Sequence, residues 1–190
     1  MPNRPVIRPA TAEDADACAA VYAPYVRDTA ISFEAEPPGP VEMAERIAAA
    51  RERHAWLVAV GPGGEVLGYA YGGPWKSREA YAWTCEVSVY LAASARGRGL
   101  GRALYEALFA ELVARGMVVA VAGMTVPNEA SAALHRALGF SEVGTFRGVG
   151  WKHGAWRDVT WFRRALVEAP ADGPRGPTPP VTPSSAPSGA

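Results

Sequence analysis

Cysteine is scarce in this 190-residue sequence, and the two cysteines present lie far apart. Cys18 and Cys85 fall outside the spacings typical of metal ligands, and two residues make no disulfide framework. A chain of this length buries roughly two-thirds of the surface that its unfolded form exposes, so it needs no covalent or metal staple. We therefore expect a core held by apolar packing and no bound metal.

Excess charge and long apolar runs are also missing. Nineteen basic residues balance nineteen acidic ones, and the pI is about 6.8. Nucleic acid and anionic membrane surfaces both select for cationic proteins, so neither is expected as a partner. No stretch approaches the roughly 18 apolar residues of a membrane-spanning helix, and the first ten residues lack the apolar segment of a secretory signal. These absences predict a cytoplasmic protein.

Composition divides the chain into a folded part and a tail. Hydrophobic residues make up 49% of the sequence and charged residues 20%, as in proteins with a packed core. The segment 168–190 consists mainly of Pro, Ala, Gly, Ser and Thr and has no aromatic residue. Such a segment buries too little apolar surface to offset the entropy lost on ordering. We expect one domain over residues 1–167 and a disordered tail over residues 168–190.

Apolar periodicity and turn residues predict the order of helices and strands. Every second residue from Tyr81 to Leu91 is apolar, which predicts a strand over residues 80–91. Helical spacing of apolar residues begins at Leu100 and ends at Gly116. Pro24 is expected to kink or break a helix over 11–26. Further helices are expected over 41–53 and 128–138, and further strands over 6–8, 56–60, 66–71, 117–126, 140–146 and 157–162.

This order favours an α+β fold. The turn at residues 61–64 joins two strands as a hairpin, and a single strand–helix–strand unit lies in the middle of the chain. Hairpins with one such unit are typical of a mixed sheet and not of a doubly wound parallel one.

A segment rich in glycine and arginine precedes the helix that starts at Leu100. Backbone N–H groups at a helix start lack partners within the helix, and the helix dipole favours an anion there. Glycine also lets a phosphate approach the backbone closely. An anion site and a plain glycine-rich turn explain the segment about equally well at this point. The segment reads Arg96-Gly97-Arg98-Gly99-Leu100-Gly101.

Two common nucleotide-binding motifs do not fit this segment. In a dinucleotide fingerprint that starts at Gly97, the last glycine would fall on Arg102, and no acidic residue ends the following strand. The Gly-Lys-Ser/Thr of a Walker loop is absent. The sequence therefore argues against nicotinamide and ATP as ligands.

The same segment resembles a motif of the GNAT family of N-acetyltransferases. Arg96-x-x-Gly99-x-Gly101 is similar to the family's Gln/Arg-x-x-Gly-x-Gly/Ala loop, which binds the pyrophosphate of acetyl-CoA. Residues 128–140 resemble its Asn…Ser…Leu-Tyr…Gly-Phe segment, with His135 in place of the tyrosine. Further segments resemble the phosphinothricin/methionine sulfoximine acetyltransferase branch, in which this histidine is typical. They are 32–34, 56–59, 68–71, 81–86 and 149–159.

The resemblance implies a fold, a co-substrate and an assembly. The fold would be the GNAT fold, a mixed and mostly antiparallel sheet splayed between its fourth and fifth strands with helices on both faces. Acetyl-CoA would bind in the cleft, and the protein would be a homodimer. Asn128 and Ser131 also read simply as a helix cap and its N3 residue. The coenzyme-binding residues would be Val87, Ser88, Val89, Arg96, Gly97, Arg98, Gly99, Leu100, Gly101, Asn128 and Ser131.

Acetyl transfer to an amino acid needs a base, because its amine is mostly protonated at neutral pH and only the neutral amine attacks. Glu86 is the candidate, since it lies in an apolar strand where burial raises the proton affinity of a carboxylate. A structural ion pair with an arginine would also explain a buried glutamate, but the resemblance favours catalysis. His135 is the second candidate, as acid for the departing thiolate, as a relay for the amine's proton, or as a structural residue.

Cations and aromatic residues are the candidates for binding the acceptor. An amino acid with a phosphinate or sulfoximine group needs donors for its carboxylate and its tetrahedral oxygens. A solvated loop would explain the presence of Lys76 and Arg78 equally well. Trp151, Trp156 and Trp161 are expected in the core or the dimer interface. The candidate substrate-binding residues are Phe33, Lys76, Arg78 and Tyr90.

These observations together predict an acyltransferase. It would move acetyl from acetyl-CoA to the α-amine of a small amino acid such as phosphinothricin or methionine sulfoximine, by direct attack with Glu86 as general base. Two alternatives stay open: the same chemistry on another small amine or a protein N-terminus, and a non-catalytic acyl-CoA-sensing module. Glu86 and His135 favour an enzyme, because a sensing module has no need of them.

Overall fold

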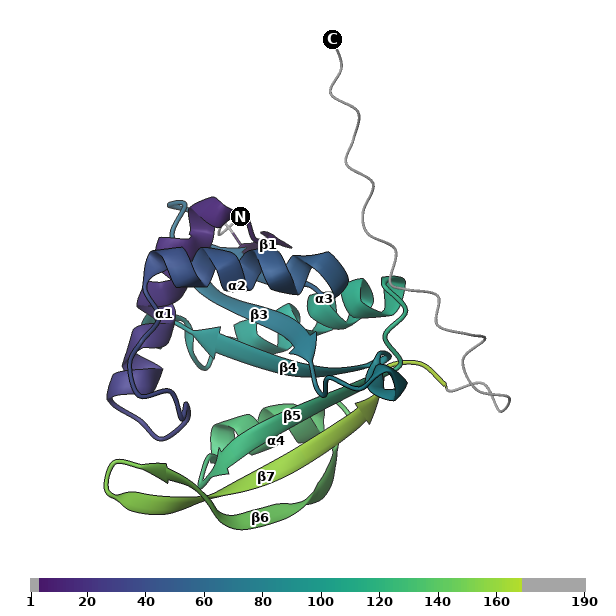
Figure 1. The fold of residues 1–190 in the computed structure, drawn as a ribbon. Coiled ribbons are helices and arrows are strands. Elements are labelled where there is room, and N and C mark those ends of the chain that lie inside the picture. Colours follow the sequence, from purple (N-terminus) through teal and green to yellow (C-terminus); the bar gives the residue numbers. More distant parts are fainter. Residues whose placement is uncertain (1–3, 169–190) are drawn as a thin grey trace.

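The computed structural model describes residues 4–168, which form a seven-stranded sheet in the order β1-β2-β3-β4-β5-β7-β6 (Figure 1). β4 and β5 pair in parallel, and all other neighbours pair antiparallel. The predicted mixed, mostly antiparallel sheet is confirmed, whereas the predicted tail lies outside the described residues except for Glu168. The strands are β1 (Val6–Pro9), β2 (Trp56–Val60), β3 (Val66–Pro74), β4 (Thr84–Leu91), β5 (Val119–Val126), β6 (Ser141–Lys152) and β7 (Ala155–Ala165).

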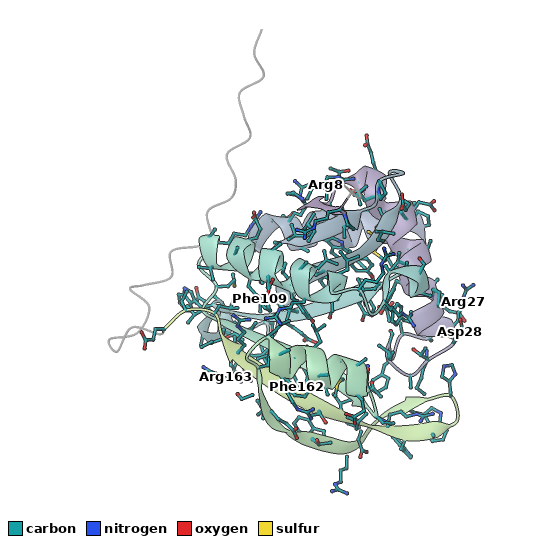
Figure 2. All side chains as sticks on the ribbon, turned by 180° about the vertical axis from the view of Figure 1, so that it is seen from behind. Arg8, Arg27, Asp28, Phe109, Phe162 and Arg163 are labelled. Carbon is teal, nitrogen blue, oxygen red and sulfur yellow. The ribbon has the colours of Figure 1, made fainter. Side chains whose placement is uncertain are left out.

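Helices cover both faces of the sheet, as expected. α1 (Ala15–Arg27) and α2 (Pro40–Arg53) pack on one face, and α3 (Leu100–Ala114) and α4 (Glu129–Ala137) cover the other, which Figure 2 shows from behind. Each face has its own buried core, one around Val26, Ile47 and Tyr69 and the other around Leu108 and Phe162. Three short 3-10 helices complete the described chain: η1 (Ala12–Asp14), η2 (Glu79–Tyr81) and η3 (Ala93–Ala95).

The strand predicted over 80–91 begins only at Thr84. Tyr81 ends η2, and its ring packs edge-on against Trp75 with the centroids 5.1 Å apart. Alternating apolar residues before Thr84 therefore belong to an aromatic loop that packs on itself. Short-range alternation alone does not distinguish such a loop from a strand.

Pro24 does not break its helix. α1 runs through it to Arg27, since a proline near the end of a helix removes one backbone hydrogen bond while Tyr25 and Val26 beyond it stay buried against the sheet. The predicted first turn is a separate element, η1, in which Asp14 accepts two hydrogen bonds of 2.7 Å from Arg8.

The last two strands are longer than predicted. β6 and β7 form a hairpin that continues to Lys152 and Ala155, where the sequence predicted strands only over 140–146 and 157–162. Glycines interrupt the alternation of side chains, and the register shifts twice along β6. Figure 1 shows this hairpin reaching toward the segment that follows α1.

Candidate functional site

β4 and β5 separate partway along their length. Their parallel pairing covers only Thr84–Glu86 and Val119–Val121, although both strands continue for five residues beyond it. Figure 1 shows the two strands diverging. The splay expected between the fourth and fifth strands is confirmed, and it leaves an opening that begins at Glu86.

Backbone donors of β4 face this opening. The carbonyl of Trp83 accepts a 2.8 Å hydrogen bond from the N–H of Val118, so odd-numbered residues of β4 direct their backbone groups toward β5. The N–H groups of Val87 and Val89 have the same orientation and lie beyond the paired part of the strands. They are therefore placed to bind a ligand carbonyl.

A narrow cavity of about 60 Å³ lies in the opening. Its lining comes from both strands, from α4 and from Tyr105 of α3. The structure thus brings together several residues that the sequence placed far apart. The predicted site residues in this lining are Val87, Ser88, Val89, Tyr90, Asn128, Ser131 and His135.

The glycine-rich segment leads from β4 into α3. Gly97 and Gly99 have φ angles of 73° and 77°, and a Cβ at either position would meet no atom within 4 Å. Glycine is therefore required here by backbone conformation and not by crowding. Gly99 is the N-cap of α3, and its carbonyl accepts the first helical bond from Ala103. The N–H groups of Leu100, Gly101 and Arg102 consequently have no partner within the helix.

Arginine side chains flank these free N–H groups. Arg96 stacks over the ring of Tyr25 at 4.9 Å, whereas Arg98 is exposed. Gly101 has a different environment, because a Cβ there would point between Leu91 and Leu134, each 3.5 Å away. The loop thus offers donors and cations on an open surface, as an anion site requires.

Asn128 and His135 shape the α4 side of the opening. Asn128 caps the helix by accepting a 3.2 Å hydrogen bond from the N–H of Ser131, as the sequence predicted. The Nδ1 atom of His135 lies 2.7 Å from the carbonyl oxygen of Ser131, so Nδ1 carries the proton and Nε2 is a bare acceptor. Nε2 is buried and has no hydrogen-bond partner within the described residues.

Burial sets the protonation of His135. The residue is 4% exposed, and its ring stacks on Phe162 at 5.2 Å and meets the edge of Phe140. Burial lowers the pKa of His135, while its hydrogen bond to the backbone of Ser131 opposes the shift. The imidazole is therefore neutral at pH 7, with its proton on Nδ1 and a free lone pair on Nε2.

Glu86 lines a second cavity of about 410 Å³. Its neighbours there are Ile31, Phe33 and residues of β5, β6 and β7, which are apolar except for Thr125. Burial raises the pKa of Glu86, and the charge of Lys76 partly opposes the shift. No cation within residues 4–168 pairs with its carboxylate within 4.0 Å. The arrangement has the features of a base and not those of a structural ion pair.

Lys76 and Arg78 line a third cavity, of about 600 Å³, between α2 and β3. Stacked rings of Trp56, Tyr69 and Tyr71 are part of its wall. Gly73 and Thr84 also line this cavity. Gly73 is the cross-strand partner of Glu86, and Thr84 precedes Glu86 by two residues on β4. The predicted cations therefore lie in a cavity next to Glu86, while Phe33 shares the cavity of Glu86 itself.

Tyr90, Trp161 and several residues that the sequence analysis did not single out form the rest of the cavity walls. Tyr90 packs edge-on against Tyr22 and Tyr25, with centroids 4.7 and 5.0 Å away. Sequence reasoning placed Trp161 in the core or at an interface, whereas it lies in the wall of the Glu86 cavity. It also did not single out several residues that line these two cavities, because most of them carry no chemical signal that separates a cavity wall from a core. The missed residues are Ile31, Tyr105, Ala122, Gly123, Met124, Thr125, Phe146 and Val159.

Residues 4–168 hold no group of three or more His, Cys, Asp or Glu side chains arranged to bind a metal ion. In the same residues, no helix combines the length and apolar character needed to cross a membrane.

Comparisons with known proteins agree with this geometry. The family model described as "Acetyltransferase (GNAT) domain" matches residues 7–161. The chain is 42% identical to phosphinothricin N-acetyltransferase of Streptomyces viridochromogenes, over 95% of this chain and 97% of the relative. It is 39% identical to the L-methionine sulfoximine/L-methionine sulfone acetyltransferase of Pseudomonas paraeruginosa, over 84% of this chain and 94% of the relative.

A solved structure shows the same fold with a ligand. The crystal structure of a phosphinothricin acetyltransferase from Sinorhizobium meliloti in complex with acetyl-CoA superimposes with a TM-score of 0.87. It is 34% identical in sequence, and the match covers 94% of this chain and 98% of that one.

Proposed function

Because this chain belongs to the GNAT family of acetyltransferases and is an acyltransferase that uses acetyl-CoA, we propose that its acceptor is a small amino acid. The reaction is transfer of acetyl to the α-amine, with phosphinothricin and methionine sulfoximine as the acceptors to test first. The observation that carries this proposal is the position of Glu86. Its carboxylate has no ion-pair partner among residues 4–168, lines a mostly apolar cavity and lies at the point where β4 and β5 separate.

Acetyl-CoA supplies the acetyl group as a thioester. We assign its pyrophosphate to the N–H groups of Leu100 and Gly101 and to the Arg98 side chain, because these donors begin α3 and the exposed cation lies two residues before it. The N–H groups of Val87 and Val89 face the opening and would polarise the thioester carbonyl and bind the pantetheine. Asn128 and Ser131 border the same opening from α4.

Glu86 removes a proton from the substrate ammonium, directly or through a water. The neutral amine then attacks the thioester carbon, and the new C–N bond replaces the C–S bond. The thiolate leaves and takes up the second proton of the amine, directly or through a water, to give the free thiol of coenzyme A. The raised pKa of Glu86 suits it to hold the transferred proton. His135 is neutral with an acceptor at Nε2, which fits a proton relay for the amine and not an acid that donates at rest.

Lys76 and Arg78 suit the acidic groups of the acceptor. Both line the cavity next to Glu86, and the charge of Lys76 affects the pKa of the Glu86 carboxyl. An amino acid whose amine lies at Glu86 would direct its carboxylate or tetrahedral oxygens toward these cations.

We also propose that the protein is a cytoplasmic homodimer that uses the β6–β7 hairpin as its interface. Phe146, Trp151 and Trp156 on this hairpin are 61%, 59% and 66% exposed, an unusual amount of exposed aromatic surface for a monomer. Light scattering should give twice the chain mass for the wild type and a lower mass for Trp151→Ser.

The function is tested by following thiol release from acetyl-CoA with a panel of amines. The panel contains phosphinothricin, methionine sulfoximine, glutamate, lysine and a peptide with a free N-terminus. We expect release with the first two compounds. Release only with the peptide would contradict the amino-acid proposal, and no release despite tight acetyl-CoA binding would favour a sensing module.

A further inference from the structure

Phe33 lies against a glycine on the opposite side of its cavity. A Cβ built on Gly150 of β6 would overlap the Phe33 ring, whose Cδ2 atom would be 2.7 Å from it. Gly150 is not among the glycines with positive φ, so its backbone would accept an alanine without strain. The three atoms nearest to that Cβ all belong to the Phe33 ring, so the ring is what an added side chain would meet first.

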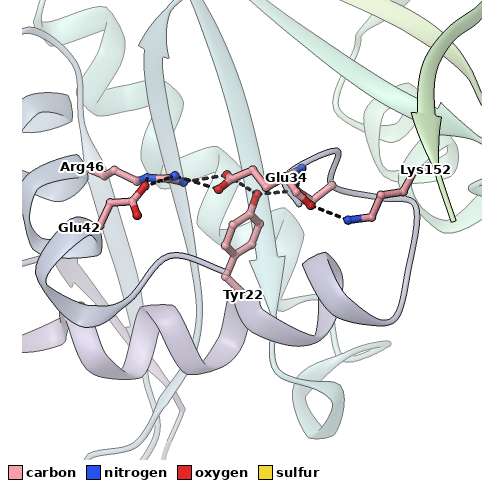
Figure 3. Close-up of polar contacts among 6 residues, drawn as sticks. Tyr22, Glu34, Glu42, Arg46 and Lys152 are labelled. Atoms are coloured by element: carbon pink, nitrogen blue, oxygen red, sulfur yellow. Dashed lines mark hydrogen bonds and ion pairs between the residues drawn. The ribbon is translucent and has the colours of Figure 1, made fainter. Parts of the chain in front are cut away.

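The backbone on both sides of Phe33 is held in place. Glu34 accepts two hydrogen bonds of 2.8 Å from Arg46 and one of 2.8 Å from the Tyr22 hydroxyl (Figure 3). The N–H of Glu34 donates to the Ser32 hydroxyl, which in turn lies 2.7 Å from the Tyr22 hydroxyl. Residues 32 and 34 are thus tied to α1 and α2, and Phe33 between them can move only its side chain.

The hairpin that carries Gly150 is tied to the same segment. Lys152 is buried, and its Nζ donates to the carbonyl oxygen of Glu34, as Figure 3 shows. The Nε2 of His153 lies 3.0 Å from the carbonyl oxygen of Thr29. The backbone of Phe33 and the backbone of Gly150 are therefore both held in place when a methyl group is added between them.

The Phe33 side chain is 40% exposed, and it lines the cavity of about 410 Å³ that Glu86 also lines. Gly150 closes the side of the ring toward the hairpin. A methyl group at position 150 would push the ring away from the hairpin, and displacement into this cavity would narrow the space that the acceptor needs.

We propose that Gly150 determines acceptor specificity. Because glycine has no side chain, the Phe33 ring can pack against the backbone of Gly150, and this position of the ring sets the width of the acceptor cavity. The inference rests on the proposed function, in which the acceptor occupies the cavity of Glu86. Gly150 is a positioning residue that acts through Phe33 and does not touch the reacting atoms.

The test compares Gly150→Ala, Phe33→Ala and the double variant. In Gly150→Ala, kcat/KM for the best acceptor of the wild type should fall about tenfold or more, the scale of one methylene group in a substrate pocket. The KM for acetyl-CoA should stay unchanged. In the Phe33→Ala background the same substitution should change kcat/KM by about twofold or less, because the ring that it displaces is gone.

Gly39→Ala is the matched control. It adds the same methyl group at a glycine with no atom within 4 Å of the new Cβ, and it should leave kcat/KM unchanged. Melting temperatures of all variants show whether any loss of activity is a loss of folding.

A crystal structure of Gly150→Ala makes the test independent of the substrate. We expect the Phe33 ring displaced toward Glu86. A ring displaced away from the cavity, or an equal loss of kcat/KM with and without Phe33, would overturn the inference. If the wild type acetylates no amino acid, the proposed function fails, and the ring position in this structure still decides the role of Gly150.

Discussion

His54 should make the protein unstable in mild acid. The residue is the C-cap of α2 and is 7% exposed. Burial and, to a smaller extent, the positive charges of Arg53 and Arg115 together lower the pKa of His54 from 6.5 to about 4. In the unfolded chain the imidazole takes up a proton near its ordinary pKa of about 6.5. Stability is therefore complete above that pH and is lost as the pH falls toward 4.

The size of the effect follows from this shift. One pKa unit corresponds to about 1.4 kcal/mol, so the free energy of unfolding should fall by about 2 kcal/mol between pH 7 and pH 5 and by about 3 kcal/mol at pH 4. A typical domain is stable by only about 5–15 kcal/mol, so such a loss is easily measured. Burial lowers the pKa of His135 as well, which adds a loss of the same sign.

Urea denaturation of the wild type and His54→Gln at pH 7 and pH 5 measures this contribution. The variant should lose about 2 kcal/mol less than the wild type over this interval, since carboxyl groups titrate equally in both proteins. Equal losses in the wild type and in His54→Gln would refute the argument.

Two further predictions concern the opening between β4 and β5. Arg98→Glu should weaken acetyl-CoA binding by about tenfold or more in calorimetry, because a charged hydrogen bond contributes about 1.5–3 kcal/mol. Arg4→Glu, at another exposed arginine, should leave the affinity unchanged. Equal affinities of Arg98→Glu and the wild type would contradict the phosphate assignment. His135→Phe keeps an aromatic ring beside Phe162 but removes the acceptor, so kcat should fall at least tenfold with little change in melting temperature, and full activity would show a structural role.

Local sequence was sufficient for the parts of the fold that local physics determines. The alternation from Thr84 to Leu91 predicted β4, and the glycines at 97 and 99 predicted a loop that needs positive φ before a helix. The same reasoning extended β4 too far, because Tyr81 and Trp83 alternate as strand residues do while they form part of an aromatic loop.

Site residues with titratable side chains could be predicted from the sequence, whereas site residues that act through packing could not. Glu86 and His135 stand out as titratable groups in apolar surroundings. The contact of Phe33 with Gly150, the acceptor at His135 Nε2 and the role of Trp161 as a cavity wall all depend on distant segments meeting. Periodicity within one segment carries no information about such contacts. The separation of Lys76 from the Glu86 cavity depends on the tertiary fold in the same way.

The central claim is that Glu86 is the general base, and Glu86→Gln tests it most directly. The substitution keeps size and hydrogen bonding but removes proton acceptance, so kcat should fall by about 10²–10⁴-fold while calorimetry gives an unchanged Kd for acetyl-CoA. Glu111→Gln, at an exposed glutamate of α3 outside the three cavities, should leave kcat unchanged. A wild-type kcat in Glu86→Gln, with the loss confined to KM for the acceptor, would contradict the claim and leave Glu86 only the role of binding the ammonium by charge.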